Sequence, residues 1–212
     1  MIIVEIFMKN FFAAMSSTLY TRIMLSKSTI ALRSISSTTQ LKSQQDTVVS
    51  SLKSMKSAPA PALALGASGL IPFISAPIYL YQMQEFIPMI GQAQLAYGAV
   101  ILSFLGGVRW GKLVSLPPPI QPSWNQFSWS VTPSLIAWPA LLLPHFQAAN
   151  LAIVSGLGLC GYLDFKQSGY QPWFKGLRIV LTTVASVSML STLLLSLILE
   201  QEDKVKQNKS ES

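Results

Sequence analysis

The sequence predicts an all-α, polytopic membrane helix bundle of about five transmembrane helices, preceded by a disordered N-terminal targeting segment. Half of the 212 residues are hydrophobic and only 11% are charged, whereas soluble domains carry about 25% charged residues. The apolar residues gather in five runs that approach the ~20 residues needed to cross a bilayer. We therefore expect a membrane domain at 58–199 and a disordered C-terminal tail at 200–212.

Residues 1–57 are basic, rich in Ser and Thr and poor in acidic residues. They contain seven Lys or Arg residues, against only Glu5 and Asp46. This composition is typical of a mitochondrial transit peptide. A secretory signal would place its basic residues first and follow them with a longer apolar core, so we favour the mitochondrial interpretation. A disordered cytosolic tail remains the alternative, since its composition would be the same.

The first apolar run, at about 63–83, contains no charge. Pro72 and Pro77 interrupt it. Each proline removes a backbone hydrogen bond, so we expect a kinked helix.

The second run, at about 93–114, has small residues at every fourth position. A matching pattern occurs in the fourth run, at about 148–164. Small residues let two membrane helices approach closely, so we expect these two helices to pack together. The stripes are Ala99, Ser103, Gly107 and Gly111 in the second run, and Ala148, Ala152, Gly156 and Cys160 in the fourth.

The third run, at about 129–145, carries three prolines, and a tight turn at His145 separates it from the fourth run. The two runs are predicted to form a helical hairpin that crosses the membrane out and back. A re-entrant pair is the alternative, because both runs lie near the lower limit of ~17 residues. The fifth run, at about 177–199, is the cleanest predicted span.

Loop charge gives the orientation. With five spans, seven basic residues fall on the N-terminal side: Lys53, Lys56, Arg109, Lys112, Lys166, Lys175 and Arg178. The positive-inside rule then places the N-terminus in the matrix and the C-terminus in the intermembrane space of a mitochondrial inner membrane. Four tryptophans fall at helix ends on the same side, where amphipathic rings favour the interface: Trp110, Trp124, Trp129 and Trp173.

Polar and aromatic residues converge on this basic side as a possible structural or lipid-binding cluster: Arg109, Trp110, Lys112, Asp164, Trp173 and Arg178. Three interpretations are open. Arg109 and Arg178 can snorkel to water or simply determine topology, or Asp164 can pair with one of them, because a desolvated carboxylate needs a cation. The basic residues can also bind an anionic lipid such as cardiolipin.

Catalytic, cofactor and metal sites are not expected. Cys160 and His145 are the only residues of their types, which leaves little material for a metal site or a catalytic triad. We expect Cys160 to pack as a small residue and His145 to lie at the surface. Gly106-Gly107 lacks the spacing of a phosphate-binding loop. The dispersed basic residues form no nucleic-acid-binding face.

Several segments together resemble the transmembrane protein 69-like family: LGASGLIPF (65–73), AYGAVILSFLGGVRWG (96–111), PSLIAW (133–138) and LRIVLT (177–182). This domain-of-unknown-function family includes proteins named mitochondrial inner membrane protein 1. The resemblance covers about residues 63–195 and implies an integral mitochondrial membrane protein with no assigned reaction.

These observations favour a non-enzymatic scaffold or assembly component of the inner membrane that acts through helix packing and through lipid or protein partners. The alternative is a small-solute transporter or channel, because proline-broken helices line the substrate sites of some transporters. A membrane enzyme that uses Asp164 on a lipid substrate is the least supported function.

Overall fold

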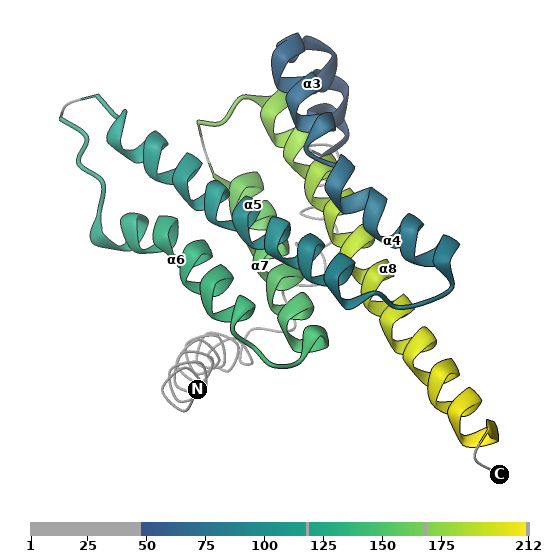
Figure 1. Cartoon of the computed structure of the whole chain (residues 1–212). Coiled ribbons are helices and arrows are strands. Elements are labelled where there is room, and N and C mark those ends of the chain that lie inside the picture. Colours follow the sequence, from purple (N-terminus) through teal and green to yellow (C-terminus); the bar gives the residue numbers. More distant parts are fainter. Residues whose placement is uncertain (1–47, 118, 168, 211–212) are drawn as a thin grey trace, which may run out of the picture.

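The computed structural model describes residues 48–117, 119–167 and 169–210, with side chains up to Gln201. Its regular elements are all helical (Figure 1). The short 3-10 helix η1 (Met55–Ser57) precedes α3 (Ala60–Ser68), α4 (Ile71–Met83), α5 (Pro88–Val114), α6 (Trp124–Leu141), α7 (Phe146–Lys166) and α8 (Pro172–Ser210). Most of the predicted transit peptide, residues 1–47, lies outside the described residues.

The all-helical architecture is confirmed, and the prediction of about five membrane helices agrees roughly with the structure when α3 and α4 are counted as two halves of one span. Four segments of the described chain are long and apolar enough to cross a membrane: Ala60–Met83, Pro88–Val114, Phe146–Lys166 and Pro172–Gln201. The helix α6 is not among them. It has 18 residues, and its first half carries several polar side chains.

The first span is broken, as its prolines predicted. α3 ends at Ser68 and α4 begins at Ile71, immediately before Pro72. Pro77 lies inside α4 and has no N–H for the carbonyl of Phe73, one turn earlier. The side-chain amide of Gln94, on α5, donates to that carbonyl at 2.8 Å. A side chain from the next helix therefore satisfies a carbonyl that the proline leaves without its usual donor.

The helices α5 and α7 pack together, as predicted, but α5 uses a different face. A Cβ at Gly98 would lie 3.0 Å from Ile153, and a Cβ at Gly156 would lie 2.5 Å from Leu102. A Cβ added at Gly107 or Gly111, from the predicted stripe, would meet nothing within 4 Å in the described part of the chain. A four-residue repeat drifts by about 40° per step around an α-helix. The stripe is buried at Ala99 and has therefore turned outward by Gly107.

The hydrophobic core lies where α5, α6, α7 and α8 meet. Fully buried side chains from three of these helices form its centre: Leu95, Leu102, Ile153, Leu157 and Met189. α6 runs back along α5, and a Cβ at Gly106 would collide with the carbonyl oxygen of Ser130. α5 and α6 can lie this close only because Gly106 has no side chain.

The α6–α7 hairpin starts and ends outside its predicted limits. α6 begins at Trp124 because Ser123 and Gln126 form a capping box at its N-terminus. α7 covers 21 residues, which is longer than the predicted 148–164 and long enough to span a membrane. His145 is exposed and Cys160 is buried, as expected.

Both predicted tails are shorter than expected. α8 continues beyond residue 199 to Ser210, because residues 200–209 are mostly Glu, Gln and Lys, which are good helix formers. Residues 48–57, assigned to the N-terminal tail, are helical and pack on α8. Gly176 allows this, since any Cβ there would collide with the carbonyl oxygen of Ser51.

Candidate functional site

Asp164 joins three helices at the end of the bundle where α5 and α7 finish and α8 begins, which we call the basic end (Figure 1). Its Oδ1 lies 3.1 Å from Nη2 of Arg109 on α5, and its Oδ2 lies 3.0 Å from Nε of Arg178 on α8. Each carboxylate oxygen thus accepts from one guanidinium. The sequence predicted one arginine partner for Asp164, and the structure provides two. We call these three residues the ion cluster.

The ion cluster is buried. Asp164 is 5% exposed, Arg109 7% and Arg178 8%, so neither arginine snorkels to water and that interpretation is wrong. Removing one partner from a buried ion pair is strongly destabilising, because it leaves an uncompensated charge. The three side chains therefore hold α5, α7 and α8 together as a unit.

Two guanidinium groups face a single carboxylate, so the ion cluster has a net charge of +1. Two buried polar atoms near the start of α8 have no hydrogen-bond partner among the described residues. These atoms are Nη2 of Arg178 and Oγ1 of Thr182, which lies one turn further along α8. Thr182 packs on Gly161 of α7, where a Cβ would lie 3.1 Å from its methyl carbon. The basic end therefore keeps a positive charge and has hydrogen-bond donors on Arg178 and Thr182 that could bind a ligand.

A surface pocket of about 360 Å³ lies at the basic end, lined by residues of α5, α8 and the loop between α7 and α8. Lys112, one turn after Arg109 on α5, lines it together with the rings of Tyr170, Trp173 and Phe174. The Nζ of Lys112 lies 3.7 Å from the centre of the Tyr170 ring, which is cation–π geometry. Gly169 supports this contact by taking the left-handed conformation, with φ +81°.

Tyr170 connects the pocket to the ion cluster electrostatically. Burial raises the pKa of its hydroxyl, the charge of Asp164 raises it further, and Arg109 and Arg178 oppose the shift. The hydroxyl is therefore a neutral donor at physiological pH. It is buried and has no hydrogen-bond partner among the described residues.

The structure brings together five of the six predicted cluster residues. Trp110 is the exception: it is 45% exposed, and its ring lies 4.7 Å from that of Phe127 on α6. It does not line the pocket. Tyr170 was not among the predicted cluster residues. Its place in the short loop after Asp164 and Lys166 could have predicted that it lies at the basic end.

The side chains at the basic end are not those that usually bind a metal ion. No group of three or more His, Cys, Asp or Glu side chains in the described part of the chain could hold a metal ion. The basic end presents two arginines, a lysine, a tyrosine hydroxyl and aromatic rings. Such a set suits recognition of a phosphate or carboxylate group.

Comparison with known proteins agrees with the membrane architecture. A family described as "Protein of unknown function (DUF3429)" matches residues 58–194. A relative from Xenopus tropicalis named "Transmembrane protein 69" is 41% identical over 177 residues, which cover 82% of this chain and 70% of the relative. The protein of that name from Mus musculus is 38% identical over 65% of this chain and 57% of its own length. No solved structure matches the chain.

Proposed function

This chain belongs to the DUF3429 family, and we propose that it is a non-enzymatic protein of the mitochondrial inner membrane that binds an anionic lipid head group at its basic end. In this function it acts as a scaffold or assembly component and holds its lipid, such as cardiolipin, next to protein partners. The observation that carries the proposal is the excess of positive charge in the ion cluster, where Nη2 of Arg178 is buried and has no hydrogen-bond partner among the described residues.

The charge at the basic end supports a phosphate ligand. Guanidinium groups form short, strong hydrogen bonds with phosphate oxygens, and basic pockets between membrane helices bind cardiolipin head groups. The pocket lined by Lys112 and Trp173 lies at the same basic end of the bundle as the ion cluster. A phosphate there would offset the remaining positive charge.

The mitochondrial location rests on residues 1–57, whose basic and acid-poor composition is that of a transit peptide. The orientation rests on the seven basic residues at the N-terminal side. They put the basic end in the matrix and the C-terminus in the intermembrane space. Protease protection of a C-terminal tag in intact and outer-membrane-ruptured mitochondria tests both statements.

Lipid binding is tested by native mass spectrometry of the full chain, with added cardiolipin or phosphatidylcholine. We expect Lys112→Gln to weaken cardiolipin binding roughly fivefold, since one lysine near an anionic lipid surface contributes ~1 kcal/mol. Lys166→Gln is the matched control, because Lys166 is exposed over the ring of Tyr162 and does not line the pocket. Equal cardiolipin binding by the two variants would contradict the proposal.

The scaffold function is tested separately, by affinity purification from gently solubilised mitochondria. A reproducible set of co-purifying inner-membrane proteins is expected, and a consistently partnerless chain would count against a scaffold. The transporter alternative is favoured by one observation, the pocket beside the proline-broken helix α4. Flux assays in liposomes test it directly.

A further inference from the structure

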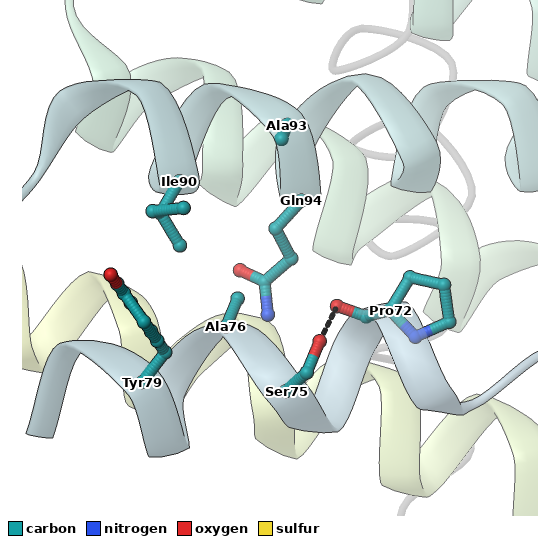
Figure 2. Close-up of a pocket in the computed structure, with 7 residues that line it drawn as sticks. All are labelled: Pro72, Ser75, Ala76, Tyr79, Ile90, Ala93 and Gln94. Carbon is teal, nitrogen blue, oxygen red and sulfur yellow. Dashed lines mark hydrogen bonds between the residues drawn. The ribbon is translucent and has the colours of Figure 1, made fainter. Parts of the chain in front are cut away.

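A second pocket, of about 300 Å³, lies between α4 and α5, far from the basic end. We call this region the amide end: α4 finishes there, and α5 and α7 begin. Gln94 lies 15 residues before Arg109, so about 22 Å of helix separates the two sites. The pocket is lined by Pro72, Ser75, Ala76, Tyr79, Ile90, Ala93 and Gln94 (Figure 2).

Gln94 places an unused hydrogen-bond acceptor in this pocket. The side chain is only 2% exposed. Its Nε2 donates to the carbonyl of Phe73 at 2.8 Å, and this bond fixes which way the amide points. The Oε1 is left buried and has no hydrogen-bond partner among the described residues. Figure 2 shows this oxygen directed toward the space between Ile90 and Tyr79.

The rest of the pocket defines what can bind there. None of the residues that line it is charged, and most of them are apolar. Ser75, Tyr79 and Ala93 are exposed, so the pocket opens sideways toward the lipid. Gln94 lies six residues into α5, or about 9 Å from its start. A charged head group would remain nearer the water, whereas a single hydroxyl can reach this depth.

We propose that this pocket binds a neutral lipid of the diacylglycerol type, whose free hydroxyl donates a hydrogen bond to Oε1 of Gln94. The acyl chains leave through the opening beside Tyr79 and Ala93. The apolar side chains of Ala76 and Ile90 contact the part of the lipid next to the hydroxyl. This site is independent of anionic lipid binding at the basic end, since it uses other residues and another chemical class of ligand.

The test uses the full chain in phosphatidylcholine nanodiscs with a photoactivatable, clickable diacylglycerol as the probe. The matched probe is its methyl ether, which is equally neutral but has no hydroxyl donor. We expect the hydroxyl probe to label α4 and α5 peptides roughly threefold to tenfold more strongly, the range of one neutral hydrogen bond. Peptide mapping by mass spectrometry measures the difference.

Two variants on α5 provide the protein control. Ala93→Leu puts a larger side chain in the pocket without touching the Gln94–Phe73 bond, and should reduce labelling to the level of the methyl ether. Ala96→Leu adds the same side chain at an exposed position outside the pocket, and should leave labelling unchanged. Equal labelling by both probes, as a bound water or ordinary lipid contact would give, overturns the proposal. So does equal labelling of both variants.

Discussion

The basic end of the bundle holds its helices together with charges, whereas the amide end uses neutral side-chain amides. At the basic end, Asp164 links α5, α7 and α8 through two arginines. At the amide end, Gln94 donates to the carbonyl of Phe73, and Asn150, which is fully buried, donates to the carbonyl of Met189 at 3.3 Å. Both ends thus use polar side chains to fix helix positions.

The difference lies in what each end has left over. Two cations around one anion leave a charge, which suits an anionic partner at the membrane surface. Each amide donates through its nitrogen, and its oxygen has no hydrogen-bond partner in the part of the chain that the structure describes. Such an acceptor suits a neutral donor from within the bilayer. Charge therefore predicts a surface ligand at one end, and an unused acceptor predicts a lipid-phase ligand at the other.

The largest effect is expected from Asp164→Ala, which leaves two buried arginines without their counter-ion. We expect it to lower the free energy of unfolding by about 3–5 kcal/mol, measured by SDS titration in mixed micelles. Replacing Arg109, Asp164 and Arg178 together by leucine should restore stability, because an apolar set can equal a buried ion cluster.

The triple leucine variant also separates folding from binding. It should be stable and yet fail to bind cardiolipin. A stable Asp164→Ala protein would show that the ion cluster does not hold the three helices together.

An intermediate effect is expected where α6 packs on α5, one turn before Arg109. Gly106→Ala would bring a methyl group against the carbonyl oxygen of Ser130, and should cost about 1–3 kcal/mol. Gly107→Ala is the matched control, since its methyl group would meet nothing within 4 Å among the described residues and alanine improves helix propensity. The same SDS titration measures both. If the two adjacent alanine variants had equal stability, the close α5–α6 contact would be contradicted.

The smallest effect is expected at the amide end. Gln94→Leu leaves the carbonyl of Phe73 unsatisfied and should cost roughly 1 kcal/mol. Pro77→Ala supplies a backbone N–H one turn later, so Gln94→Leu should cost less in that background. A double-mutant cycle over both positions measures this coupling. Strictly additive costs would mean that Gln94 does not substitute for the N–H that proline lacks.

Several elements could be read from local patterns. The five apolar runs, the break at Pro72 and the clustering of basic residues at one end follow from composition and proline chemistry. The Asp164 pairing was half predicted, because a carboxylate at the end of an apolar helix needs a cation but its spacing does not say how many. The role of Gln94 was not predicted from the sequence. It lies 17 residues after Pro77, and its amide can reach the carbonyl that this proline leaves free only because α4 and α5 lie side by side.

The sequence by itself determined that this is a multi-pass, all-helical membrane protein with one basic end, because hydrophobicity, proline and charge act locally or by simple counting. The tertiary structure decided which faces meet. It brought Asp164 between two arginines separated from it by 55 and 14 residues, and turned Gly107 away from α7 while Gly106 packed on α6. Helix rotation and crossing depend on how all side chains pack together, so no single segment specifies them.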